Sequence, residues 1–213
     1  MRHLRTALVS LLLVGTAHAG NNEVSIGSSN RSLRSDSANA ITPDNLGSFE
    51  LAYGRRLDLP LVPSLELWAT AHYSYGALDG NLFSMATEAD SHVLTAGGRA
   101  RYFVLSHLAA TARLDVGTAR TSLTVEGQEG DVSDAGWGGV LGGAVGVDLL
   151  VVAKSAFSCG FRFDLGYVAM TGVALAPAAA KNPDMLEIDT DQASVGHLDL
   201  GGRYASLTFL AQF

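Results

Sequence analysis

The sequence has little of several things on which other protein classes depend. Of its 213 residues, one is cysteine, five are proline and only 16% are charged. A single cysteine excludes an internal disulfide framework and any cysteine-rich zinc site. Ordinary soluble domains carry about a quarter charged residues, so this chain is short of solubilising side chains. Its 14 basic residues against 21 acidic ones argue against nucleic acid as a partner.

The apolar run at the amino terminus is too short to cross a bilayer, which takes about 20 residues as a helix. The run covers residues 7–14 and follows Arg2 and Arg5. Ala17-His18-Ala19 comes after it as a small-x-small cleavage pattern. That layout is typical of a secretory signal peptide and disfavours the alternative of a membrane anchor. We predict a signal peptide over residues 1–19 and one exported domain over residues 20–213.

What the chain has instead is apolar and polar residues in alternation. In the last nine residues the apolar side chains share one face of a strand, because successive side chains point to opposite sides. These outward candidates are Ala205, Leu207, Phe209, Ala211 and Phe213. The same alternation predicts eight strands, at about 22–33, 47–58, 64–76, 92–104, 108–118, 136–151, 160–170 and 205–213.

The connections between these strands alternate in length. Long polar connections are expected at 34–46, 77–90, 121–135 and 175–195, and short ones at 59–63, 105–107 and 152–158. All five prolines fall in connections, as expected if strand interiors need their backbone donors. The order predicts an up-and-down meander with its long connections at one end and both termini at the other.

The polar face of the strands carries large side chains of both charge signs. They are Glu50, Arg56, Glu66, His72, Arg99, Arg101, Arg113, Asp115, Asp148, Arg162 and Asp164. They could cover the surface of a soluble, pocket-bearing barrel, or fill the interior of a membrane barrel as a paired network. In a membrane only helices and closed barrels satisfy the backbone. Eight strands close around an interior just wide enough for side chains.

The apolar face favours lipid outside. Aromatic residues mark both of its ends, as in outer-membrane barrels: Phe49, Tyr75 and Trp137 toward the long connections, Tyr102, Phe161 and Phe213 toward the short ones. An arginine on a lipid face at the midplane costs about 2–4 kcal/mol, and the middles of these faces have none. We therefore predict an all-β fold, a closed, up-and-down, antiparallel eight-stranded transmembrane β-barrel.

The carboxyl terminus adds a resemblance. A strand that ends in Phe213 and is apolar at alternate positions back to Ala205 resembles the assembly signal of bacterial outer-membrane barrels. With the signal peptide and the order of the loops, the chain resembles a small barrel of the OmpA/OmpX type. The resemblance implies the outer membrane of a Gram-negative bacterium, with outer-membrane lipid around the barrel. It also implies that the barrel-assembly machinery recognises the last strand, and it says almost nothing about activity.

The long connections are acidic, which bears on partners. They hold Asp36, Asp44, Asp79, Glu88, Asp90, Glu126, Glu129, Asp131, Asp134, Asp184, Glu187, Asp189 and Asp191. We expect solvated loops, with weakly bound divalent cations as the alternative, since such ions take oxygen ligands. The full calcium-loop pattern is missing, so no metal site and no cofactor are predicted.

No stretch carries a catalytic motif. Glu66, His72 and Ser74 share a strand face, but Glu66 and His72 are six positions apart, about 20 Å along a strand, so no compact triad forms. The glycines of 138–146 are best explained as space for bulky neighbours in the interior, and Cys159 has no predicted chemistry. We expect a non-enzymatic envelope-structural or surface-interaction protein that acts through its acidic loops. The alternatives are a conduit for small or hydrophobic solutes and, less favoured, a lipid-modifying enzyme.

Overall fold

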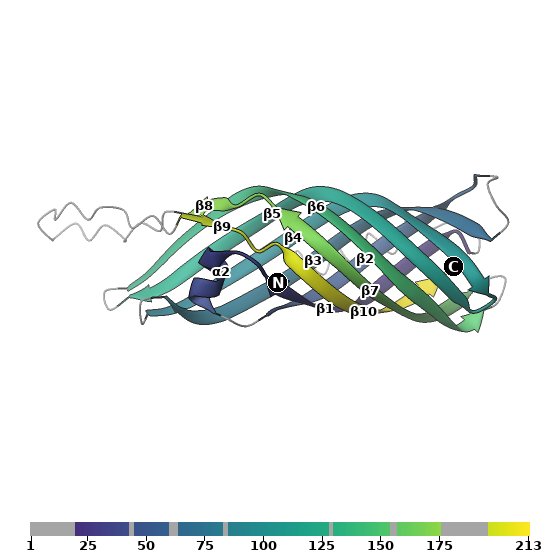
Figure 1. The fold of residues 1–213 in the computed structure, drawn as a ribbon, viewed down its shortest axis with the longest axis horizontal. Helices are drawn as coiled ribbons and strands as arrows, with labels where there is room; N and C mark the ends of the chain where they lie inside the picture. Colours follow the sequence, from purple (N-terminus) through teal and green to yellow (C-terminus); the bar gives the residue numbers. More distant parts are fainter. Residues whose placement is uncertain are drawn as a thin grey trace, which may run out of the picture.

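Eight antiparallel strands close into a barrel, which confirms the predicted fold class (Figure 1). The computed structural model describes residues 20–42, 45–59, 64–82, 85–127, 130–153, 157–175 and 196–213, and the predicted signal peptide lies outside them. The barrel strands are β1 (Asn22–Leu33), β2 (Leu46–Leu57), β3 (Leu65–Leu82), β4 (Met85–Leu105), β5 (Leu108–Gly127), β6 (Gly130–Ala153), β7 (Ser158–Met170) and β10 (Gly202–Gln212). Each strand pairs with its neighbours in chain order, and β10 pairs with β1 to complete the ring.

Three smaller elements lie at one end of the barrel, which we call the outer end. They are the short helix α2 (Asp36–Ile41) and the strands β8 (Val173–Leu175) and β9 (Gly196–Leu198), which pair with each other (Figure 1). The carboxyl terminus lies at the opposite end, the short-turn end. Among the described residues, no helix is long and apolar enough to cross a membrane.

The register of the strands fixes the width of the barrel. Following paired residues once around the ring from Glu23 returns to β1 at Leu33, ten residues farther along. A shift of ten residues over eight strands corresponds to a strand tilt of about 40°. At this tilt and strand number the interior is filled by side chains, and no wide lumen remains.

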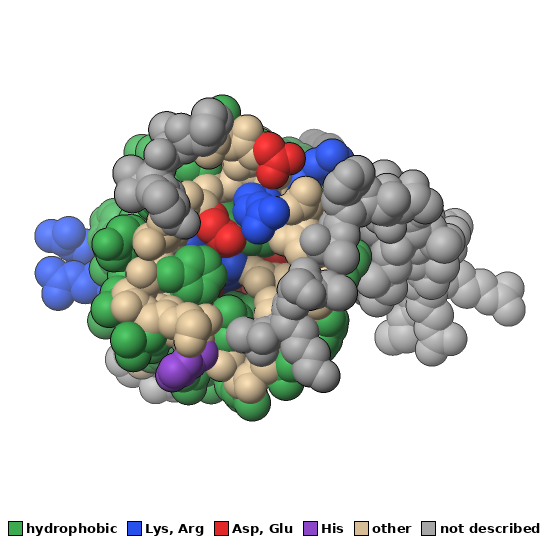
Figure 2. Space-filling view, turned by 90° about the vertical axis from the view of Figure 1, so that its right-hand side faces the viewer, with side chains coloured by type: hydrophobic (Ala, Val, Ile, Leu, Met, Phe, Trp, Pro, Cys, Tyr) green, Lys and Arg blue, Asp and Glu red, His purple; other side chains and the backbone are tan. Residues whose placement is uncertain are grey.

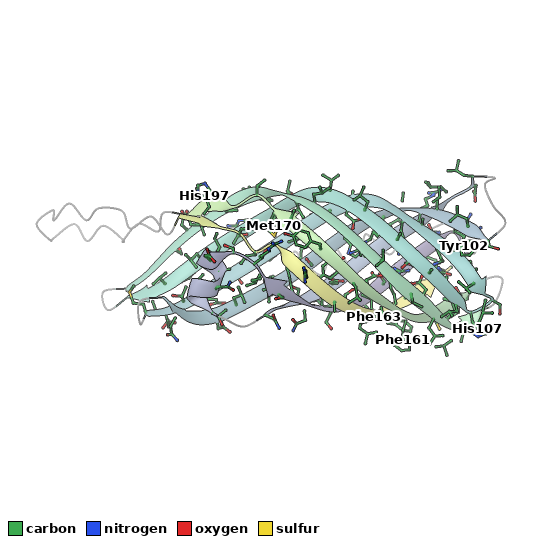
Figure 3. The ribbon with its side chains drawn as sticks, viewed as in Figure 1. Tyr102, His107, Phe161, Phe163, Met170 and His197 are labelled. Carbon is green, nitrogen blue, oxygen red and sulfur yellow. The ribbon has the colours of Figure 1, made fainter. Side chains whose placement is uncertain are left out.

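The outward face carries an apolar band. On β5 it runs over alternate residues from Leu108 to Val116, and Leu114 and Val116 are 65% and 64% exposed. Tyr102 and Phe161 border the band at the short-turn end, where Figure 3 labels them, and Phe49 and Tyr75 border it toward the outer end. A spanning strand needs about 9–11 residues, which matches the length of the band. Hydrocarbon is the solvent that such a surface requires.

Above the band the polarity of both faces reverses. The outward residues of β5 become Thr118, Arg120 and Thr124, while the inward residues Ala119 and Leu123 are fully buried. Strands β3 to β6 therefore continue beyond the bilayer as a sheet with a polar outer face and an apolar inner face.

The short helix α2, the strand β8 and Leu200 cover this apolar inner face from inside the barrel. Ile41 of α2, Val173 and Leu175 of β8, and Leu200 pack with Leu123 and its neighbours in one hydrophobic cluster. The helix contacts the edge of β3, and Thr171 joins the edge of β6 through a backbone hydrogen bond of 2.9 Å from its N–H to the Gly139 carbonyl. The outer end of the barrel is thus closed by a core like that of a soluble protein.

The predicted loops at 77–90 and 121–135 were wrong. Strands β3 to β6 run through them, and only 83–84 and 128–129 separate the paired strands. The physical reason is the reversal of polarity: the alternation continues, but with polar residues outward, so the segment is as polar as a loop. Asp79, Glu88, Asp90 and Glu126 therefore project from strands.

The other two long connections differ from expectation in part. The segment 34–46 contains α2, and the segment 175–195 is flanked by β8 and β9. Residues 176–195, which include Asp184, Glu187, Asp189 and Asp191, lie outside the described residues.

Candidate functional site

The interior of the membrane-spanning part is filled with charged side chains. The view onto the short-turn end shows acidic and basic groups near the centre, with hydrophobic side chains along the left and lower parts of the face (Figure 2). All eleven residues of the predicted polar face lie on inward-facing positions of their strands. Arg56 and Glu66 lie at the mouth, where their side chains are 35% and 22% exposed. The interior holds two groups of contacts, one toward each end of the band.

The lower group is centred on Glu23 of β1, which the sequence analysis missed. Its carboxylate pairs with Arg99 at 2.8 Å and with Arg162 at 2.9 Å, and it contacts Arg101 as well. The Gln212 Nε2 amide donates a further hydrogen bond of 2.9 Å to the same carboxylate. One acid thus joins arginines from β4 and β7 across the interior.

Asp148 of β6 is the second centre of the lower group. The Arg162 Nε atom lies 2.6 Å from its Oδ1, and the Arg101 Nε donates to its Oδ2 at 2.7 Å. With Glu66, which lies 3.5 Å from Arg101, three carboxylates balance three buried guanidinium groups. Buried charges are tolerated when they are paired and hydrogen-bonded. Arg101 and Arg162 meet that condition, whereas Arg99 has its ion pair with Glu23 but no hydrogen-bond partner for its Nε and one Nη among the described residues.

Trp68 fills the space between the arginines and the mouth. Its ring centre lies 5.3 Å from the Arg99 guanidinium carbon and 5.0 Å from that of Arg101, within the range of cation–π contacts. Its indole N–H donates to Glu66 at 3.1 Å, and the residue is 1% exposed. The buried ring thus fills part of the lower interior beside the two arginines.

The upper group is centred on Arg113 of β5. Its Nε atom lies 2.8 Å from the Asp115 carboxylate, and its Nη2 donates to the Tyr204 hydroxyl at 2.7 Å. Arg113 also contacts the His72 ring. Asp115 accepts a hydrogen bond of 3.4 Å from Thr70, and Asp164 accepts one of 3.5 Å from Thr111.

A small polar cavity lies beside the upper group. Its volume is about 40 Å³, and its polar lining includes Arg31, Glu50, His72 and Ser74. Among the described residues, the Arg31 Nε and a Glu50 carboxylate oxygen have no hydrogen-bond partner. The volume holds about two or three water molecules, which are the natural partners of such atoms.

Two of the three candidate catalytic residues, His72 and Ser74, line this cavity, and the third, Glu66, is not among its lining residues. His72 contacts Arg113, whereas Glu66 accepts hydrogen bonds from Trp68 and Arg56, so no acid–base–nucleophile relay joins them to Ser74 in the described part of the chain. No group of three or more His, Cys, Asp or Glu among the described residues is arranged to hold a metal ion.

Two glycines show how the interior accommodates its large groups. A side chain at Gly146 would collide with the Asp164 carboxylate, and one at Gly166 would meet the Tyr204 ring. The reading of the glycine run as space for bulky neighbours therefore holds at Gly146. Gly139 and Gly143 instead lie on the outward face.

The residues that the sequence analysis missed obey the same alternation as those it found. Glu23 and Arg31 occupy inward positions of β1 and are 2% and 4% exposed. Both alternate with the outward residues Val24 and Ile26, and this alternation is the signal for their inward position. The signal is weak because β1 has few large apolar residues. Leu210, an exception to the predicted polar face, is fully buried.

The carboxy-terminal residues proposed as an assembly signal all face outward: Ala205, Leu207, Phe209, Ala211 and Phe213. The Phe213 N–H donates to the Asn22 carbonyl at 2.9 Å, and the Asn22 N–H donates back at 3.0 Å, so the last residue helps to close the ring. Recognition of this strand by the assembly machinery stays a prediction.

Comparisons with known proteins find similarity in structure and none in sequence families. No protein-family model and no curated protein sequence matches the chain. The translocator domain of the autotransporter NalP from Neisseria meningitidis aligns with a TM-score of 0.50 and 8% identity, covering 100% of this chain and 95% of that one. Ail, the attachment invasion locus protein of Yersinia pestis, aligns at 0.47 and 12%, covering 92% and 98%, and Neisserial surface protein A at 0.46 and 12%, with the same coverage.

At such low identity these likenesses concern the fold alone. The lipid-facing evidence comes from the chain itself, in the exposed apolar band, its aromatic borders and the ion-paired interior. Together these features identify the chain as a small eight-stranded β-barrel of the bacterial outer membrane.

Proposed function

We propose that this protein is a non-conducting, non-enzymatic barrel that stabilises the envelope and presents a rigid acidic extension at the cell surface. The main support for the proposal is that side chains fill the interior of the barrel in two places. The network around Glu23 and Asp148 fills the short-turn half, and the apolar cluster around Leu123 fills the outer end. Among the described residues, a cavity of about 40 Å³ lies beside the upper group of contacts, which supports a filled interior.

The extension supports a role in surface interaction. In outer-membrane barrels the end with the longer connections faces outside the cell. Here that end projects Asp79, Glu88, Asp90 and Glu126 from paired strands. Asp90 is held by the Tyr75 hydroxyl at 2.8 Å and the Ser122 hydroxyl at 3.1 Å. Groups fixed before binding lose less entropy on binding, so this surface is suited to a partner with basic groups.

Planar-bilayer recording tests the closure. We expect the purified, refolded protein to give no stable unitary conductance, because side chains fill both halves of the interior. A general porin reconstituted in the same lipid shows that the recording detects open barrels. Steady single-channel openings of the wild-type protein would contradict the proposal and favour the conduit.

The non-enzymatic part has its own test in the same preparation. Incubation with labelled phospholipid or lipopolysaccharide is expected to leave the lipid unchanged. A product that the His72→Ala variant no longer makes would show that the cavity beside Arg113 is catalytic, and the proposal would fail.

A further inference from the structure

A row of outward side chains runs across strands β3 to β6, from the edge of the apolar band toward the outer end of the barrel. Tyr75 lies opposite His92, His92 opposite Arg120, and Arg120 opposite Trp137, on strands β3 to β6. Directly opposed residues have Cβ atoms about 4.5–5.5 Å apart, so the four side chains form one continuous patch. We call these four residues the rim patch.

The tilt of the strands places the rim patch across the headgroup layer. At a tilt of about 40°, each step to the next strand along a line of paired residues rises about 3 Å along the barrel axis. Tyr75 lies at the edge of the band, and three steps put Trp137 about 9 Å above it. The patch thus reaches from the hydrocarbon boundary into the polar layer of the outer leaflet.

Arg120 supplies a cation at this level. The side chain is exposed and forms no ion pair with any described residue. The nearby Asp90 already accepts hydrogen bonds from Tyr75 and Ser122 at its two oxygens. A free guanidinium group binds phosphate through two parallel hydrogen bonds, which makes Arg120 suited to a lipid phosphate.

The aromatic members of the rim patch differ in their surroundings. His92 is fixed by a hydrogen bond of 2.9 Å with the Tyr73 hydroxyl and by the Tyr75 ring, 4.9 Å away between centres. Trp137 is 71% exposed, the most exposed large hydrophobic side chain in the described part of the chain. Because it lies above the band, lipid tails do not cover it. The apolar face of a sugar ring, with its polar edge in water, is the ligand surface that suits an indole at this level.

We infer that the rim patch binds a phosphorylated glycolipid of the outer leaflet, with its phosphate on Arg120 and a sugar ring against Trp137. The inference goes beyond the proposed function and does not depend on whether the interior conducts. It rests on the depth of the patch, the unpaired guanidinium group and the exposed indole.

Titration of the purified full-length barrel with diphosphorylated lipid A, followed by native mass spectrometry, tests the inference. We expect one tightly bound lipid A, with Arg120→Ala weakening its binding about tenfold and Trp137→Ala by a similar factor. Arg120→Lys should recover part of the loss, since the charge is kept and the two-pronged geometry is not.

Arg203→Ala is the matched control. Arg203 is also outward and exposed at the edge of the band, paired with Tyr167 on β7, but lies outside the rim patch. Its removal should change binding less than about twofold, a difference expected for unspecific surface charge. Equal losses for Arg120→Ala and Arg203→Ala, or no loss for Arg120→Ala, would overturn the inference. Equally tight, Arg120-dependent binding of phosphatidylglycerol would overturn the part that assigns a sugar to Trp137.

Discussion

Replacing Glu23 with glutamine is expected to lower the free energy of unfolding by about 3–5 kcal/mol. The change keeps the shape of the side chain but removes the negative charge that Arg99, Arg101 and Arg162 share. A buried positive charge without its partner is costly because it has lost its water as well. Reversible urea unfolding in detergent micelles or lipid vesicles measures the loss.

Two controls separate this effect from a general response to substitution. Glu88→Gln changes the same type of residue at an exposed, outward position of β4 and should alter stability by less than about 0.5 kcal/mol. Combining Glu23→Gln with Arg99→Met removes the surplus charge and should restore part of the stability. A loss for Glu23→Gln no larger than that for Glu88→Gln would show that the network does not hold the interior.

An arginine introduced into the apolar band should also destabilise the barrel. Leu114→Arg places a guanidinium group near the middle of the band, at a position that is 65% exposed on the outward face. In a bilayer the expected cost is about 2–4 kcal/mol, because the charge must enter hydrocarbon or distort the lipid around it. Unfolding in phospholipid vesicles measures this cost.

The matched substitution lies four residues farther along the same strand and face. Thr118→Arg introduces the same group just above the band and should cost about 0–1 kcal/mol, as at the membrane interface. If Leu114→Arg and Thr118→Arg had equal and small effects in vesicles, the outward face of β5 would not be in contact with hydrocarbon.

The strands and the closure of the barrel could be predicted because they depend on a local period. Alternation such as that from Leu108 to Val116 is visible in any short window, and it persists wherever one face meets lipid. Each of the eight barrel strands was therefore expected near its observed place. The inward position of the eleven residues of the polar face follows from the same parity.

The extension above the membrane could not be predicted, because its physical cause is a change of solvent. Where β5 leaves the bilayer its outward face must turn polar, so Thr118 and Arg120 follow Val116 on that face. On the inward face the apolar Leu123 follows the charged residues that lie within the membrane. The period is unchanged and only its phase shifts. A search for apolar residues of constant phase therefore ends each strand too early.

Which interior charges pair with one another could not be predicted from the sequence, for a different reason. Glu23 reaches Arg99 and Arg162 only because the ring closes with a shift of ten residues. This shift brings these residues of β1, β4 and β7 to similar heights along the barrel axis. No local period encodes that shift. The sequence identifies which side chains are inward, and the register decides which of them meet.

The central claim is that the two faces exchange polarity at the edge of the bilayer, and spin-label accessibility along β5 tests it most directly. Single cysteines at alternate outward positions from Ala110 to Thr124, in a Cys159→Ser background, carry the label in a phospholipid bilayer. Labels from Ala110 to Val116 should collide more with oxygen, and labels from Thr118 onward more with a water-soluble nickel complex. High accessibility to the nickel complex at every position, including Leu114, would contradict the claim.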